Sequence, residues 1–223
     1  MTKETSQPVD TTITIGSKRT APNHPVRFSF LHVFKAKLPN NPKPSDKPKF
    51  SVQVIIDKKS PDLPAIHASM KAAHQSHKAI RGVDYDALDL ILRDGDNPKE
   101  NKKKLEHLKG CYFFNASCGE EYPPEVVGTT RDEATGKLVR LGSKDIKSGD
   151  YGAVTVNFYG YDTNGNQGIA AGLRNLQKRK NGDSLANVSN ADDDFEEEFD
   201  DEDLDEDEED EDEDIDDEFE DDA

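Results

Sequence analysis

Tryptophan is absent from this chain of 223 residues, and cysteine is scarce, with Cys111 and Cys118 as its two examples. Small domains held together by disulfide bonds use more cysteines than this, which argues against a disulfide framework and favours reduced, buried or half-buried thiols. To bind zinc, the thiols would have to combine with His67, His74 or His77, but the sequence has no CxxC pair and no compact His/Cys cluster. We therefore predict no metal and no other cofactor.

Long apolar runs are absent too. No stretch approaches the ~20 apolar residues that a membrane-spanning helix needs, and the N-terminus lacks the basic and apolar pattern of a secretory signal. We expect no membrane association and a cytoplasmic protein, in the host cell cytoplasm if the protein is viral.

Sequence motifs of catalysis are missing. There is no Walker loop, GxSxG or HExxH. Asp94-Gly95-Asp96 has the acids of a cation-binding loop, but Glu100 and Glu106 do not provide the glutamate that such a loop carries at its twelfth position. A turn is the better interpretation of this triplet, and we predict that the protein is not an enzyme.

Lysine and arginine are absent from the last 32 residues, 192–223, of which 26 are Asp or Glu. Of the 47 acids in the chain, 21 therefore remain for residues 1–191, against all 29 Lys and Arg, so the net charge of -18 hides a body of about +8. A basic body with a polyanionic tail is typical of proteins that bind nucleic acid, because the body attracts phosphates and the tail competes for the same surface or recruits partners.

The acidic tail also contains apolar residues, which a segment serving only as a solvating appendage does not need. We predict that four of them bind replication or recombination proteins: Phe195, Phe199, Ile215 and Phe219. The same segment is suited to occupy the basic surface of the body as a DNA mimic until DNA displaces it. A purely solvating role stays open as the alternative.

Composition divides the chain into three parts. Residues 1–23 are polar and predicted to be flexible, residues 24–185 form one folded domain, and residues 186–223 are too charged and too poor in apolar groups to bury a core, which predicts disorder. Hydrophobic residues make up 32% of the chain, and the deficit lies mostly in the two ends.

The first part of the domain is predicted to contain two strands followed by helix. Residues 26–37 are rich in β-formers, and residues 38–49, with four prolines and several lysines, form an exposed basic loop with phosphate-binding potential. Alternation then predicts a half-buried strand over residues 50–57, with Phe50, Val52, Val54 and Ile56 on the inner face. Ser60-Pro61 predicts a helix start, with apolar positions continuing at helical spacing to Ile80.

The second part is predicted to return to strands after a short helix over residues 85–92. Residues 110–118 form a central strand and residues 119–137 a turn-rich region. Residues 151–161 form a strand with Val154, Val156 and Phe158 on one face and three tyrosines on the other. For residues 169–180 we favour a closing strand over a helix, because Gly168 and Gly172 weaken a helix. The fold class is therefore mainly β: a small OB-fold-like antiparallel β-barrel with an inserted helix.

Aromatic and basic residues on one surface suit single-stranded nucleic acid, because unpaired bases stack on Tyr or Phe while Lys and Arg contact phosphates. We predict the following DNA-binding residues: Arg27, Lys35, Lys37, Tyr151, Tyr159, Tyr161, Arg174, Lys178, Arg179 and Lys180. Tyrosines on a strand face also pack beneath helices, so a packing role for these rings stays open.

Several segments occur in an order that resembles a known family. They are residues 27–34 (RFSFLHVF), 49–56 (KFSVQVII), 92–96 (LRDGD), 110–116 (GCYFFNA), 124–127 (PEVV), 157–162 (NFYGYD) and 168–177 (GIAAGLRNLQ). Together they resemble bacteriophage single-stranded DNA-binding proteins, a family long known as a domain of unknown function. The resemblance covers residues 26–195, and it implies an OB-fold, sequence-independent binding of single-stranded DNA, and an acidic tail that contacts replication partners. The tail is unusually long here.

Two other functions stay open. An acidic-tailed interaction module or chaperone would bind basic proteins and have little affinity for DNA. A barrel that binds duplex DNA or RNA would differ only in its ligand, and a preference for single strands over a duplex of equal charge separates these cases. The sequence also leaves a homo-oligomer open.

Overall fold

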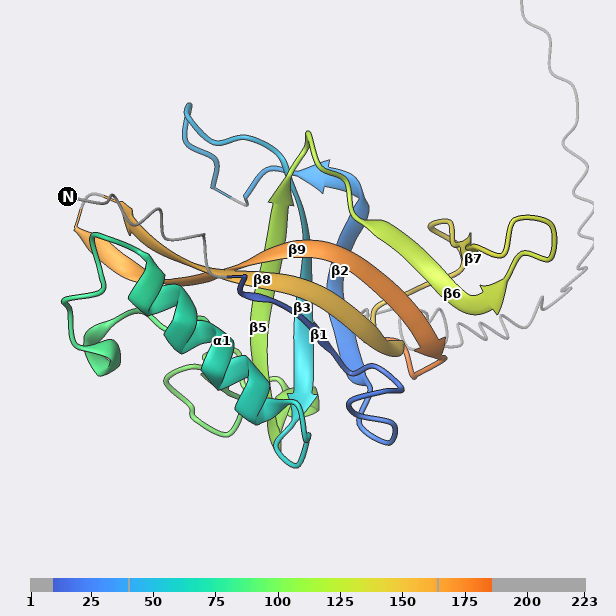
Figure 1. The fold of residues 1–223 in the computed structure, drawn as a ribbon, viewed down its shortest axis with the longest axis horizontal. Coiled ribbons are helices and arrows are strands. Elements are labelled where there is room, and N and C mark those ends of the chain that lie inside the picture. The colour runs from blue at the N-terminus through green and yellow to red at the C-terminus, as the bar shows by residue number, and fades with distance from the viewer. Residues whose placement is uncertain (1–9, 40, 164, 186–223) are drawn as a thin grey trace, which may run out of the picture. The chain divides into compact units, whose positions relative to one another are not determined.

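The computed structural model describes residues 10–39, 41–163 and 165–185 (Figure 1). Five of its strands form a closed ring, in which each strand pairs with the next: β2 (Val26–Lys37), β3 (Lys49–Asp57), β5 (Cys111–Gly119), β9 (Asn166–Lys180) and β8 (Tyr151–Thr163). This ring is the barrel of an OB-fold, as predicted. The expectation of a fully antiparallel barrel is corrected at one seam, because β5 and β9 pair in parallel at Ala116↔Ala171 and Ser117↔Gly172.

Four shorter strands extend the barrel. β1 (Thr12–Ile15) pairs with β8, β4 (Arg93–Asp94) with β5, β6 (Glu125–Arg131) with the far end of β9, and β7 (Leu138–Arg140) with β6. β1 corrects the predicted flexibility of residues 1–23 at residues 12–15, where the Thr-Ile alternation places Ile15 in the core, whereas residues 1–9 lie outside the described residues. β6 corrects the predicted turn-rich region, because its partner β9 lies about 50 residues away and local sequence gives no sign of that pairing.

The helix α1 (Leu63–Ser76) is inserted between β3 and β5 and packs against β8. It begins after Asp62, two residues later than predicted from Ser60-Pro61, with Pro64 in its first turn. The Asp62 carboxylate does not cap the helix and instead accepts a hydrogen bond from the Gly16 backbone N–H at 2.7 Å, which ties the helix start to the end of β1. In the part of the chain that the structure describes, no helix is long and apolar enough to cross a membrane.

The predicted helix over residues 85–92 is largely wrong. Its first residues form a single 3₁₀ turn, η1 (Tyr85–Ala87), and the chain then runs alongside β9. The Asp89 N–H donates to the Gln167 carbonyl at 3.0 Å and the Asp89 carbonyl accepts from the Ile169 N–H at 3.0 Å. These long-range hydrogen bonds replace the helical ones, and α1 likewise ends at Ser76, so that Ile80 reaches the core from a loop.

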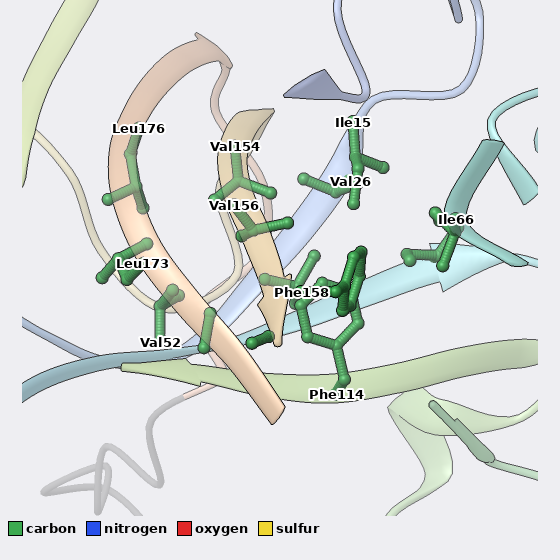
Figure 2. Packing of buried hydrophobic residues seen from close by; sticks show 14 of the residues in the cluster. Ile15, Val26, Val52, Ile66, Phe114, Val154, Val156, Phe158, Leu173 and Leu176 are labelled. Atoms are coloured by element: carbon green, nitrogen blue, oxygen red, sulfur yellow. The ribbon is translucent and has the colours of Figure 1, made fainter. Parts of the chain in front are cut away.

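The core lies inside the ring of strands (Figure 2). Phe114 of β5 and Phe158 of β8 pack with their ring centroids 5.7 Å apart, and α1 contributes Ile66. All seven residues predicted to face inward from β3 and β8 are buried: Phe50, Val52, Val54, Ile56, Val154, Val156 and Phe158.

The prediction that β3 is half-buried is corrected at Gln53 and Ile55, which are buried on its other face. Ile55 packs in a second apolar cluster with Phe113 of β5 and Leu108 of the 3₁₀ helix η2 (Glu106–Leu108). The outer face of β3 is therefore covered at one end by residues 105–108 and left accessible at the other.

Candidate nucleic-acid interface

A groove of about 940 Å³ lies on the outer face of β3 and β5, and we call it the β3–β5 groove. Its floor is made by cross-strand neighbours: Ser51 pairs with Ser117, and Gln53 pairs with Asn115. These residues alternate with Val52 and Phe114, which point into the core, so the groove floor follows directly from the two-residue period of both strands.

Two segments form the walls of the groove, and both are basic. One is the loop after β2, the other the segment that leads into η2. Among the described residues, five lysines line the groove, against the two acids Asp46 and Glu100: Lys37, Lys47, Lys49, Lys102 and Lys103. Glu100 is already engaged, since its Oε1 accepts from the Asn97 amide at 3.0 Å and its Oε2 from the Asp94 N–H. The groove is therefore electropositive, as binding to a phosphate backbone requires.

The wall that carries Lys102 and Lys103 is held in place by Asn101, which is buried. The Asn101 Nδ2 donates to the carbonyls of Gly95 and Leu105 at 3.0 and 3.1 Å, and its Oδ1 accepts from the Leu105 N–H at 2.9 Å. Lys58 fixes the base of the same wall through ion pairs with Asp94 and Asp96 at 2.5 and 2.8 Å. The two lysines are therefore presented from a fixed turn.

Phe30 of β2 lines the groove with an unusual backbone. Its φ is +47°, in the left-handed region that a bulky residue rarely adopts. It lies at an irregularity of β2, where the register with β3 shifts between Ser29 and His32, and its side chain is 49% exposed. Strained backbone that presents an apolar ring to solvent is typical of functional sites, and this ring is suited to stack on a base.

Two polar side chains add to the groove. Gln53 is only 7% exposed, and its Oε1 is buried without a hydrogen-bond partner among the described residues, which leaves an acceptor for a ligand. Burial, and to a lesser extent the neighbouring Lys37, lowers the pKa of His32. His32 is therefore uncharged at neutral pH and offers hydrogen bonds in place of charge.

The predicted DNA-binding residues lie in several places. Lys37 lines the groove, while Lys35 is exposed on β2 outside it. Arg27 donates to the carbonyls of Gly149 and Asp183, both at 3.1 Å. Its guanidinium lies 5.4 Å from the centroid of the Tyr151 ring, and the Lys180 ammonium lies 5.6 Å from the same centroid.

Two other predicted DNA-binding residues, Lys178 and Arg179, contact oxygen atoms of the protein itself. Lys178 forms an ion pair with the buried Asp150 at 2.9 Å and donates to the Asp145 carbonyl at 2.5 Å. Arg179 donates to the carbonyls of Gly16, Ala21 and Pro22 at 2.5, 3.4 and 2.9 Å. These contacts give both residues a role in the fold, by attaching the end of β9 to neighbouring loops.

The structure does not place all three predicted tyrosines on one surface with the basic stretch of β9. Tyr151 pairs with Lys180 at one end of the β8–β9 hairpin, whereas Tyr159 pairs with Ala170 near the other end. Tyr159 is 44% exposed, and the Tyr161 hydroxyl donates to Asp89 Oδ2 at 3.2 Å. Arg174 is exposed on β9, where its Nε donates to Asn157 Oδ1 at 3.2 Å.

The sequence analysis singled out one basic wall of the groove, the loop of residues 38–49, but missed most of the groove as a site. The aromatic residues predicted to bind DNA were all tyrosines, whereas the exposed aromatic residue in the groove is a phenylalanine, Phe30. A positive φ at this position leaves no trace in local sequence, since residues 26–37 have the β-formers of an ordinary strand. The lysines of the walls are about 55 residues apart and meet only through the pairing of β3 with β5.

Among the described residues, no group of three or more His, Cys, Asp or Glu is arranged to hold a metal ion. Cys111 and Cys118 are free thiols, each half-buried, as predicted. Burial raises the pKa of both thiols, which keeps them protonated at neutral pH.

Replacing Asp150 by asparagine is expected to destabilise the fold by about 2–4 kcal/mol, because the Lys178 ammonium then loses its charge partner. Burial alone would raise the pKa of Asp150, but hydrogen bonds from Lys178 and from the Lys147 and Gly182 N–H groups outweigh it and lower the pKa. The stabilisation is therefore present above the unfolded pKa of about 4 and lost as the pH falls through the folded value. Urea unfolding at pH 7 and pH 3 measures this, and equal pH dependence in both proteins would contradict it.

Comparison with known proteins places the chain in a family. A sequence profile of the family described as "Enterobacter phage Enc34, ssDNA-binding protein" matches residues 20–207, and the chain belongs to this family. Protein p50 of Acyrthosiphon pisum secondary endosymbiont phage 1 is 36% identical over 109 residues, which are 47% of this chain and 52% of that protein. The chain thus matches about half the length of this curated relative.

Solved structures show the same fold. The single-stranded DNA-binding protein from bacteriophage Enc34 has a TM-score of 0.57 at 18% identity, covering 78% of this chain and 88% of that chain. The same phage protein in complex with ssDNA has a TM-score of 0.56 at 19% identity, with 73% and 86% covered. Gp2.5, a single-stranded DNA-binding protein of bacteriophage T7, has a TM-score of 0.53 at 14% identity, with 85% and 97% covered.

Proposed function

We propose that this protein binds single-stranded DNA without sequence specificity during phage DNA replication or recombination, in the host cytoplasm, and that the β3–β5 groove is its binding site. The observation that carries the proposal is the exposed Phe30 ring on a strained backbone beside five lysines, in an OB-fold. The family of the chain and the ssDNA complex of the phage Enc34 protein support it.

In this mechanism different residues of the groove bind the bases and the phosphates. A base released from pairing stacks on Phe30, while lysines of both walls neutralise the phosphates on either side. Every base has a flat face, so stacking gives little sequence preference. The polar floor, with Gln53 and Asn115, supplies hydrogen bonds to whichever base edges reach it.

Residues outside the groove have a secondary role in the proposal. Lys35, Tyr159 and Arg174 are exposed and extend the contact beyond the groove. Arg27, Tyr151 and Lys180 form one cluster at the start of β8, and we propose that it contributes positive charge, because cations beside the ring restrict stacking on Tyr151. Residues 24–185, together with β1, form the DNA-binding domain, and no reaction is catalysed.

The described part of the chain ends next to the groove. Leu185, the last described residue, packs against the cluster of Ile55, Leu108 and Phe113, and two of these three residues line the groove. A polyanion attached at this point has a high effective concentration at the groove lysines. We propose that the tail competes with DNA there and, once displaced, recruits replication or recombination proteins through Phe195, Phe199, Ile215 and Phe219.

Truncation of the chain to residues 1–191 is expected to raise the affinity for ssDNA on the order of 10-fold at low salt, because the competing polyanion is removed. Fluorescence titration of labelled oligo(dT) at two salt concentrations measures this effect. A full-length variant with the four apolar tail residues changed to serine keeps the charge, so it should bind DNA like the wild type and lose only partner binding. Equal affinity of the full-length and truncated chains would refute competition by the tail.

The same titration with an equal-length duplex separates the proposed function from its alternatives. Stacking requires unpaired bases, so single strands should bind more tightly than the duplex in both chains. Binding of neither nucleic acid, together with binding of basic proteins, would establish the acidic chaperone in place of this proposal. An oligo(rU) of equal length reports any preference for RNA.

A further inference from the structure

A second groove, of about 580 Å³, lies between the β6–β7 hairpin and the outer face of β8 and β9, and we call it the β6–β7 groove. Thr155 of β8 and Asn175 and Gln177 of β9 line it, together with Thr14 of β1. The hydroxyls of Thr14 and Thr155 lie 3.1 Å apart. The groove floor thus carries hydroxyl and amide groups beside the buried Ala153 and Leu176.

Three cations of the hairpin line this groove: Arg131, Lys137 and Arg140. Arg140 forms an ion pair with Glu125, the one acid among the described residues that line the groove. Arg131 and Lys137 have no acidic partner within the described part of the chain, and both are exposed. Ser17, also in the lining, is followed directly by Lys18 and Arg19.

The two grooves differ in one decisive way. The β3–β5 groove is lined by Phe30 and Phe113, whereas no aromatic residue is among the described residues that line the β6–β7 groove. The described lining therefore offers no ring for stacking. Apart from Glu125, its polar side chains are of the kinds that contact phosphate and sugar, namely Arg, Lys, Ser, Thr, Asn and Gln, and they lie beside the apolar Val127, Leu138, Ala153 and Leu176. The ligand chemistry that fits it is the sugar-phosphate backbone.

The outer face of β9 connects the grooves. Ser117 of the β3–β5 groove pairs with Gly172, and Asn175 of the β6–β7 groove lies three residues further along the same strand, ~10 Å away. Between them Arg174 is exposed, and its Nε donates to Asn157 Oδ1 at 3.2 Å. A Cβ at Gly172 would approach Asn157 Oδ1 to 2.6 Å, so glycine leaves this space to the amide. A polar and basic surface thus runs from one groove to the other.

We infer that the backbone of the same DNA strand that occupies the β3–β5 groove crosses β9 at Arg174 and continues into the β6–β7 groove. This inference rests on the proposed function of the β3–β5 groove. The DNA-binding site then consists of two parts. The first stacks bases and contacts phosphates, and the second contacts the backbone alone and contributes only when the strand is long enough to reach it.

The test is to change Arg131 and Lys137 to glutamine in the full-length chain and to titrate strands of about 6 and about 16 nucleotides, the range of sites on OB-folds. The short strand should bind the variant within about twofold of the wild type. The long strand should lose on the order of 10-fold at low salt, and the slope of log K against log salt should fall by about 1.4, or 0.7 for each phosphate contact. Lys71→Gln with Lys78→Gln, two exposed lysines on α1 and just after it, is the matched control.

Arg131 also donates to the Gly136 carbonyl at 2.6 Å within the hairpin. The single variant Lys137→Gln leaves this contact intact. It should lower the slope of log K against log salt by about half as much as the double variant. An unchanged long-strand affinity, or an equal loss for both lengths, would overturn the inference. Binding of a second short strand that the double variant loses would also overturn it, by assigning the groove to another molecule. Failure of the wild type to bind the short strand would instead refute the proposed function.

Discussion

Alanine at Phe30 is expected to weaken the binding of single-stranded DNA on the order of 10-fold, and by more if two bases contact the ring. Loss of one base–aromatic stack costs about 1–3 kcal/mol, and Phe30 is the aromatic residue that combines high exposure with a place in the β3–β5 groove. Titration of labelled oligo(dT) measures the loss, which should be similar for oligo(dA), since stacking does not depend on one base.

The chain offers a matched control for this variant. Phe34 lies on the same strand and is 42% exposed, but it does not line the groove. Phe34→Ala should therefore leave binding unchanged. Equal losses for Phe30→Ala and Phe34→Ala would contradict the stacking role, because they would show a general effect of removing exposed rings from β2.

Glycine at the same position separates stacking from strain. The φ of +47° at Phe30 costs folding free energy, of order 1–3 kcal/mol for a bulky residue, and glycine adopts this conformation freely. Phe30→Gly should therefore be at least as stable as the wild type in urea unfolding while losing DNA binding. A variant that is less stable would show that the ring contributes packing that its exposure does not suggest.

Removal of the wall charges is expected to lower the affinity for single-stranded DNA by more than removal of the Phe30 ring does. Glutamine at four exposed groove lysines, Lys47, Lys49, Lys102 and Lys103, removes four candidate phosphate contacts. The slope of log K against log salt should fall by about 2.8, since each contact to a single strand contributes about 0.7. The affinity loss should reach on the order of 100-fold at low salt and shrink as salt is added.

The control for net charge is again Lys71→Gln with Lys78→Gln, both away from the groove lining. This pair should leave the salt slope unchanged if the groove holds the strand. A decrease in slope in proportion to the number of lysines removed, regardless of their position, would show that the body attracts DNA through its overall charge and would contradict a defined groove.

Local sequence patterns predicted the elements whose faces differ in polarity. The inner faces of β3 and β8 followed from alternation, β2 from its β-formers and β5 from its apolar run. The closing strand β9 followed from the glycines that weaken a helix there. The fold class followed from these strands. β6 and the chain after η1 did not follow, because their hydrogen bonds are to β9, far away in the sequence, and such pairings override local propensity.

The candidate site was harder to predict than the fold. A basic cluster such as Lys178 to Lys180 has the same composition whether its members contact phosphates or their own protein, and only the structure shows Lys178 beside Asp150 and Arg179 beside three carbonyls. Phe30 was not among the predicted DNA-binding residues, because residues 26–37 have the β-formers of an ordinary strand. A backbone irregularity, which local sequence does not indicate, turns this side chain outward into the groove.

The most direct measurement of the central claim is photocrosslinking of the full-length protein to a bromodeoxyuridine-substituted single strand, followed by mass spectrometry of the crosslinked peptides. The account predicts crosslinks at Phe30 and in the wall segment of Lys102 and Lys103, which are lost in competition with unlabelled single strand and retained with an equal-length duplex. Crosslinks confined to Tyr159 and Tyr161 at the far end of the β8–β9 hairpin, or to α1, would contradict the assignment of the β3–β5 groove.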